Sequence, residues 1–199
     1  MNELLFDPRQ GPAPLLPTLL AAQSHLKNRH TRSLVWCDPH GTIHAPVLNA
    51  MGVAVDRCYL LRPRPGQLLE VVADCLRCPG VGAVVAMLPA RLSRVEARRL
   101  QLAAERGGGL GLMVRPLGAG SDIYAAARRW LVEPAPGELG IQRWRVQLVH
   151  GHGRLLGQSF HLECRRDAAD ASKPVLVPVR SPSTLAHRPM PAPAARSSA

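Results

Sequence analysis

Residues 11 to 18 have the spacing of a nucleotide-binding P-loop but lack side chains that such a loop needs. In the motif G-x-x-x-x-G-K-[ST], the second glycine brings backbone N–H groups to phosphate and the lysine neutralises the phosphate charge. Here Leu16 replaces that glycine and Pro17 replaces the lysine, so that only Gly11 and Thr18 match. The segment predicts a phosphate site that has kept its spacing and lost its chemistry.

Length and charge limit the class of protein. The chain has 199 residues with 46% hydrophobic content, enough for one α/β domain with a core and a tail. Lys and Arg number 25 against 14 Asp and Glu, a formal net charge of +11. Arginine suits bidentate contacts with phosphate or carboxylate, which favours nucleic acid or an acidic protein face as a partner. The composition of a GC-rich genome is the alternative explanation of this charge.

Neither a membrane segment nor a cofactor site is predicted. No apolar run approaches the length of about 18 residues needed to span a bilayer, and we expect a cytoplasmic, nucleoid-associated protein. The five cysteines are an odd number in mostly apolar surroundings, which favours reduced thiols over a disulfide framework. Cys75 and Cys78 form a lone C-x-x-C with no second pair, so we expect no metal and no cofactor.

Strands and helices alternate through the first part of the chain. Apolar runs predict strands at 3–6, 33–37, 58–61, 81–88 and 110–114, and helical spacing predicts helices at 15–26, 46–51, 67–78 and 95–106. Ser93 and Glu96 form a capping box before the last helix, for which we expect apolar contacts from Val95 and Leu102. This alternation predicts an α/β fold with a mainly parallel, doubly wound sheet.

The pattern then changes to consecutive strands, at 128–133, 141–149 and 158–164, which should extend the sheet in antiparallel fashion. From residue 166 the sequence is rich in Ala, Pro and Ser with little apolar content to bury, and we expect a disordered tail. The predicted organisation is one domain at 1–165 and a tail at 166–199.

Two groups of arginines are predicted to contact DNA or a protein partner. Arg91, Arg94 and Arg98 follow helical spacing on one side of the last helix, and Arg143 and Arg145 lie on the outward face of a strand. A solvated polar face is the alternative explanation for both groups.

A further pattern is spread over the runs 35–41, 48–53, 56–57, 60–63, 82–89, 98–105, 110–116 and 131–134. Together these runs resemble ImuA, a RecA-like accessory protein of bacterial translesion DNA synthesis, and the resemblance covers roughly residues 3 to 164. It implies a RecA-like core. It also places residues 11 to 18 at the position of the RecA phosphate loop.

The RecA pattern implies further losses. Asp38 is kept, but His40 stands where RecA has a catalytic glutamate, and Met87 stands where an acidic residue organises magnesium. The phosphate lysine, the catalytic base and the metal carboxylate are thus absent, at Pro17, His40 and Met87. Because phosphoryl transfer depends on electrostatic positioning, this predicts a pseudoenzyme without ATPase activity.

The resemblance implies a non-catalytic adaptor in SOS-type DNA damage tolerance. Its implied partners are an inactive polymerase-like ImuB and an error-prone replicative-type polymerase, with RecA and DNA as further partners. One alternative is a division inhibitor that binds FtsZ, because residues 82–116 also resemble SulA. A second alternative is an active nucleotide-binding ATPase with a divergent loop.

Overall fold

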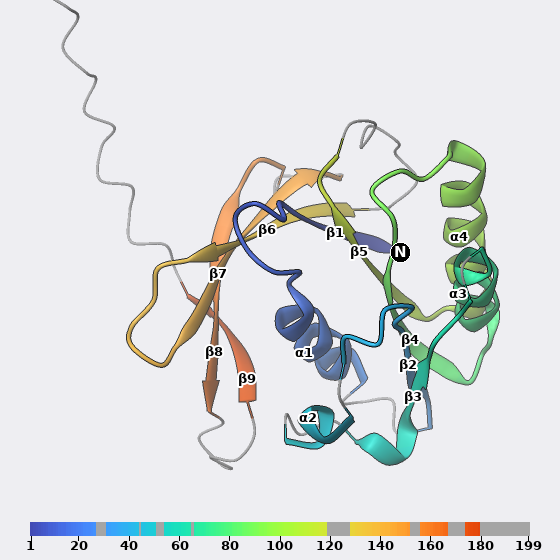
Figure 1. Ribbon diagram of the computed structural model, residues 1–199, viewed down its shortest axis with the longest axis horizontal. Coiled ribbons are helices and arrows are strands. Elements are labelled where there is room, and N and C mark those ends of the chain that lie inside the picture. The colour runs from blue at the N-terminus through green and yellow to red at the C-terminus, as the bar shows by residue number, and fades with distance from the viewer. Residues whose placement is uncertain are drawn as a thin grey trace, which may run out of the picture.

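The computed structural model describes residues 1–26, 31–43, 45–50, 54–64, 66–118, 128–151, 156–166 and 174–179 (Figure 1). The strands are β1 (Asn2–Phe6), β2 (Ser33–Cys37), β3 (Cys58–Leu61), β4 (Val81–Met87), β5 (Leu110–Pro116), β6 (Arg128–Ala135), β7 (Gln142–His150), β8 (Ser159–Arg166) and β9 (Pro174–Val179). The helices are α1 (Leu15–Leu26), α2 (Ala45–Ala50), α3 (Leu68–Arg77) and α4 (Arg94–Gly107), with a 3₁₀ turn, η1 (Val55–Arg57).

All the described strands join one sheet in the order β3-β2-β4-β5-β1-β6-β7-β8-β9. The pairs from β3 to β6 are parallel. The pairs from β6 to β9 are antiparallel. The expected mixed α/β sheet is therefore confirmed. Parallel strands place their carboxyl ends at one edge, and this is the edge where open α/β sheets usually bind ligands.

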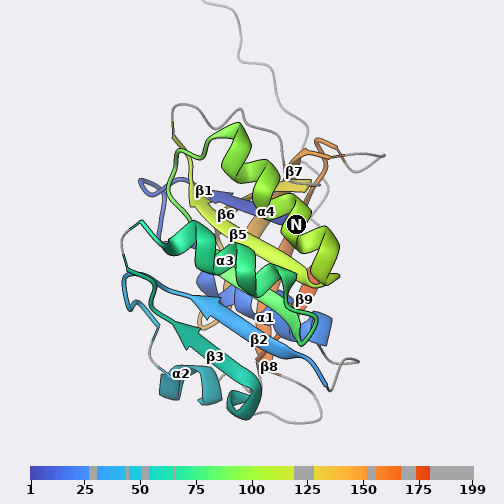
Figure 2. The ribbon, with the colours of Figure 1, turned by 90° about the vertical axis from the view of Figure 1, so that its right-hand side faces the viewer.

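Helices cover both faces of the parallel strands. Helix α1 packs against β2, β4 and β5 on one face and also meets β9, because the sheet curls round it (Figure 1). Helices α3 and α4 lie side by side on the opposite face (Figure 2). The buried residues Ala83 and Val85 of β4 face α1, whereas Val84 and Ala86 face α3 and α4. A strand covered on both sides must be apolar on both sides, which explains the continuous apolar run of β4.

Helix α4 begins and ends with clear local signals. The predicted capping box is confirmed, since the Ser93 hydroxyl accepts from Glu96 N at 3.2 Å and Glu96 Oε2 accepts from Ser93 N at 2.7 Å. The helix stops at Gly108, whose φ of 64° lies in the left-handed region. Just before it, Gly107 packs on α3, where an added Cβ would lie 1.9 Å from the Leu76 carbonyl oxygen.

The apolar contacts expected for α4 were assigned to the wrong side of the helix. Val95 is 79% exposed and Leu102 is 37% exposed. The face that meets α3 and the sheet is instead built from Ala97, Leu100, Ala103, Ala104 and Gly107. Apart from Leu100 these side chains are small and let the two helices approach closely, while Val95 and Leu102 lie outside.

The antiparallel part continues past the predicted domain boundary. Strand β7 alternates as expected, with Val146 and Leu148 buried and Arg145 exposed. Strand β8 extends to Arg166, and β9 forms within the segment expected to be a disordered tail. That expectation is wrong for 174–179, because the β-prone residues of Pro-Val-Leu-Val-Pro-Val pair with β8. Residues 167–173 and 180–199 of the predicted tail lie outside the described part of the chain.

Within the described residues, no helix is both long and apolar enough to cross a membrane.

Candidate functional site

The degenerate loop joins β1 to α1, as the P-loop spacing predicts, but it offers few donors to a phosphate. Pro17 lies in the first turn of α1 and has no N–H. The N–H groups of Leu15 and Thr18 donate to the carbonyls of Ala13 and Pro14, at 2.7 and 3.2 Å. Phosphate binding at a helix N-terminus needs free N–H groups, and these two are already used within the loop.

Two positions that match the P-loop motif also serve local packing. The Thr18 hydroxyl, which binds magnesium in a working loop, is buried and donates to the Pro14 carbonyl at 2.6 Å. At Gly11 an added Cβ would lie 2.7 Å from Cγ of Pro134, so this glycine allows the loop to pack against β6. Leu16 is half-buried and its neighbour Pro17 is buried. Gly11 and Thr18, which match the motif, therefore stabilise the local structure of this chain.

Asp38 is the one acidic residue kept from the RecA pattern, and its carboxylate holds its own loop. One oxygen, Oδ1, accepts from His40 N at 3.3 Å and from the Thr42 hydroxyl at 3.2 Å. The other, Oδ2, accepts from Ile43 N at 2.8 Å. With 3% exposure and both oxygens engaged, Asp38 shapes the turn after β2.

The remaining two positions of the RecA pattern lie at the same edge of the sheet. The His40 side chain is exposed in the loop after β2, and Met87 ends β4. Met87 is partly buried against the core on the α1 side of the sheet. The structure thus brings the loop before α1, Asp38, His40 and Met87 to the carboxyl ends of parallel strands. It does not give them the charges that phosphoryl transfer requires.

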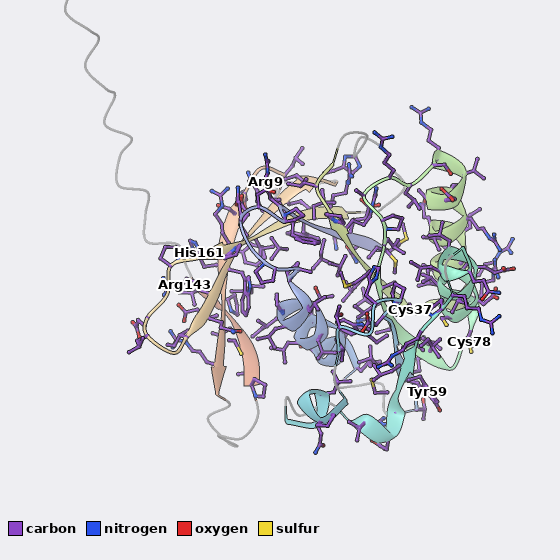
Figure 3. All side chains as sticks on the ribbon, in the orientation of Figure 1. Arg9, Cys37, Tyr59, Cys78, Arg143 and His161 are labelled. Atoms are coloured by element: carbon purple, nitrogen blue, oxygen red, sulfur yellow. The ribbon has the colours of Figure 1, made fainter. Side chains whose placement is uncertain are left out.

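No other cluster supplies that chemistry in the described part of the chain. No group of three or more His, Cys, Asp or Glu side chains there has the arrangement of a metal site. Cys37 is fully buried at the end of β2, and Cys78 lies at the outer end of α3 (Figure 3). The hydrogen bond with Cys75, together with burial, raises the pKa of the Cys37 thiol. This thiol stays protonated and is a poor nucleophile.

The arginines predicted to contact DNA or a partner differ in how they are held. Arg91 and Arg94 are exposed, and Arg98 donates to Gln101 Oε1 at 2.9 Å. Arg143, whose position on β7 Figure 3 shows, forms an ion pair with Glu163 on β8. Arg145 pairs with Glu133 at 2.9 Å. The arginines of α4 are thus more available to a partner than those of β7.

A buried ion trio lies on the face of the sheet that α3 and α4 partly cover, and sequence reasoning missed it. Glu3 of β1 accepts from Arg115 Nη1 at 3.0 Å and from Arg129 Nε at 2.8 Å. Their side chains are 1%, 1% and 5% exposed. The available signal was a charged residue inside an otherwise apolar strand, Asn-Glu-Leu-Leu-Phe. Completely enclosed, the trio links β5, β1 and β6.

Comparison with known proteins now bears on these observations. No family model matches the chain. Over 145 residues the sequence is 34% identical to protein ImuA of Caulobacter vibrioides strain NA1000, which covers 64% of this chain and 59% of that protein. The resemblance to ImuA is confirmed. The chain spans 59% of the length of this curated ImuA.

A more distant likeness to SulA is also present. The cell division inhibitor SulA of Pectobacterium atrosepticum is 26% identical over 125 residues, covering 62% of this chain and 73% of that protein. The crystal structure of SulA from Pseudomonas aeruginosa superposes with a TM-score of 0.46 at 23% identity, covering 51% of this chain and 86% of that one.

Proposed function

We propose that this chain is a non-catalytic, RecA-like adaptor in SOS-type damage tolerance, where it serves mutagenic translesion synthesis by binding other proteins. The likeness to ImuA supports the pathway. The strand order β3-β2-β4-β5-β1-β6, with helices on both faces, supports a RecA-like ancestry.

One observation carries the adaptor mechanism: the edge where a recombinase would hold its nucleotide is occupied by groups that bond to one another. Thr18 donates to Pro14, and both oxygens of Asp38 accept from the loop that follows. With Pro17 at the lysine position, the motif has no cation for phosphate, and the arginine of this loop, Arg9, pairs with Asp7 at 3.0 Å. A protein that keeps such a scaffold without the catalytic groups acts by presenting surfaces.

The proposed partners are an ImuB-like inactive polymerase and an error-prone replicative-type polymerase, with RecA and DNA as further partners. The exposed arginines of α4 and the net charge of +11 support contact with an acidic protein face or with phosphate.

Damage-induced mutation frequency in a deletion strain tests the pathway. We expect the frequency after ultraviolet irradiation to fall towards the spontaneous level and to be restored by the wild-type gene. The variant His40→Ala should restore it equally, because this exposed side chain has no catalytic duty in an adaptor. Unchanged mutagenesis in the deletion strain would reject the proposal.

Calorimetry with Mg-ATP tests the absence of catalysis separately. We expect no saturable heat and no phosphate release from the full chain. Micromolar binding or measurable turnover would favour the divergent ATPase instead.

The likeness to SulA over 125 residues supports a second candidate, an inhibitor that binds FtsZ. Overexpression distinguishes the two functions, because a division inhibitor produces long filaments in undamaged cells. We expect cells of normal length, and a two-hybrid signal with the polymerase-like partner and not with FtsZ.

A further inference from the structure

The outer face of α4 carries a groove that combines arginines with exposed aliphatic side chains. It has a volume of about 560 Å³ and is lined by Arg77 of α3 and by Arg94, Val95, Arg98, Arg99, Leu102, Ala103 and Arg106 of α4. Val95, Arg99, Leu102 and Arg106 follow one another at helical spacing and form a stripe. Figure 2 shows α4 on the outside of the molecule, beside α3.

The positive charge of this groove is only partly balanced by the acidic residues around it. Five arginines line it, against three acidic residues nearby: Asp74 pairs with the groove residue Arg77, while Glu96 and Glu105 accept from the neutral donors Ser93 N and Gln101 Nε2. Among the described residues, the guanidinium groups of Arg94, Arg99 and Arg106 have no such partner. An anionic group can therefore bind these three arginines without first displacing an existing ion pair.

The exposed aliphatic residues indicate which class of molecule binds in the groove. Val95 is 79% exposed and Leu102 is 37% exposed, although the opposite face of the helix is well packed. A nucleic acid strand would use the arginines but would gain little from Val95 and Leu102, because bases stack on aromatic rings and none lines the groove. A protein helix with glutamates around a leucine would satisfy both features.

We infer that this groove, comprising the Val95–Arg106 stripe and Arg77, docks an acidic amphipathic helix of a protein partner. Leucine side chains of the partner pack on Val95 and Leu102, while its carboxylates pair with Arg99, Arg106 and Arg94. This groove is the surface through which the proposed adaptor would bind a partner. Its role in the cell rests on the proposed function, whereas the binding itself does not.

Fluorescence polarisation of a labelled synthetic helix with leucines at i, i+3 and i+7 and glutamates flanking this apolar stripe, titrated with the full chain, tests the surface directly. The double variant Arg99→Glu/Arg106→Glu should weaken binding about tenfold or more, since it replaces attraction with repulsion. Leu102→Ser should weaken it about tenfold through lost apolar burial. The matched control is Arg62→Glu/Arg64→Glu, which makes the same change in net charge at two exposed arginines after β3 and should leave affinity within about twofold.

Three results would overturn the inference. The first is the absence of saturable binding, and the second is equal binding of a peptide with glutamine for glutamate. The third is tight binding of a single-stranded oligonucleotide that Arg99→Glu/Arg106→Glu abolishes while the peptide does not bind, which would assign the groove to nucleic acid.

The same variants distinguish a failure of the groove proposal from a failure of the proposed pathway. If Arg99→Glu/Arg106→Glu restores mutagenesis in the deletion strain as well as the wild type does, the groove is rejected and the adaptor role stands. Peptide binding in a protein whose deletion leaves mutagenesis unchanged would uphold the groove and reject the pathway.

Discussion

At the scale of single residues, the most consequential side chain is the buried carboxylate of Glu3. It lies between two guanidinium groups, and Arg115 also donates to the carbonyls of Pro89 at 3.2 Å and Ala90 at 2.5 Å. Buried charges are tolerated only where opposite charges and hydrogen bonds replace water. The trio therefore fixes β1 between β5 and β6 and also ties down the loop after β4.

Replacing Glu3 by glutamine should destabilise the fold by about 3–5 kcal/mol, because two buried guanidinium groups lose their counter-charge. Urea unfolding followed by circular dichroism measures the change in the free energy of unfolding. The control Glu133→Gln removes the carboxylate of the more exposed Arg145 pair and should cost about 0–1 kcal/mol. Equal effects of the two variants would contradict the importance of the trio.

The Glu163 carboxylate should give stability a specific dependence on pH. Hydrogen bonds from Arg165, and then from Arg143, hold the pKa of Glu163 below its ordinary value of 4.5. A lowered pKa in the folded state means that the stabilisation is present above the unfolded value and is lost as pH falls through the folded one. The difference in Tm between the wild type and Glu163→Gln should therefore be largest near neutral pH and shrink below pH 4.5.

Thermal melts between neutral and acid pH measure this difference, with the exposed Glu138→Gln as the control. A gap in Tm that is constant across the range would show that the two ion pairs add nothing specific to the ionised form.

The sequence predicted side-chain interactions only between residues that are near one another in the chain. The capping box between Ser93 and Glu96 was predictable because both residues lie in one helical turn. Glu3 meets Arg115 and Arg129 across 112 and 126 residues of sequence, and no local pattern encodes such pairs. The role of Asp38 was missed for a different reason, because its type matched the RecA pattern while its hydrogen bonds serve the adjacent loop.

At the scale of elements, hydrophobic periodicity predicted most of the sheet and helices. The bounds of α1, β2 and β3 agree with those predicted from apolar spacing. Strand β9 was missed because Ala, Pro and Ser dominate the segment around it, and its pairing with β8 is a tertiary choice. The buried face of α4 was misassigned because, apart from Leu100, it is built from three alanines and a glycine, while the larger Val95 and Leu102 lie outside.

The close contact between α3 and α4 predicts that two neighbouring glycines differ in their sensitivity to substitution. In Gly107→Ala the new Cβ would lie 1.9 Å from the Leu76 carbonyl oxygen, so α3 and α4 must separate and we expect a loss of about 3 kcal/mol or more. In Gly108→Ala the Cβ meets open space, and only the positive φ of 64° opposes it, at about 1–2 kcal/mol.

Denaturant unfolding of both glycine variants measures the contrast, since they differ by one position and add the same methyl group. A Gly107→Ala protein as stable as Gly108→Ala would show that the two helices have room to part. It would also weaken the view that small residues at this contact push Val95 and Leu102 to the outside.

At the scale of the whole molecule, the net charge of +11 predicts sequence-independent affinity for DNA. That affinity should fall linearly with salt on a log–log plot as counterions are released. The distribution of charge decides which arginines contribute. On the β7 face, Arg143 and Arg145 are held by Glu163 and Glu133, whereas on the α4 face three arginines have no acidic partner among the described residues.

The double variant Glu133→Gln/Arg145→Gln separates net charge from contact, because it removes one charge of each sign and leaves the total at +11. If the Glu133 carboxylate already occupies the Arg145 guanidinium, the affinity for single-stranded DNA should change by less than about twofold and the salt slope should stay the same. Fluorescence anisotropy at several salt concentrations measures both quantities. A loss of about one from the slope would show instead that Arg145 leaves Glu133 to bind a phosphate, and would place DNA on the antiparallel half of the sheet.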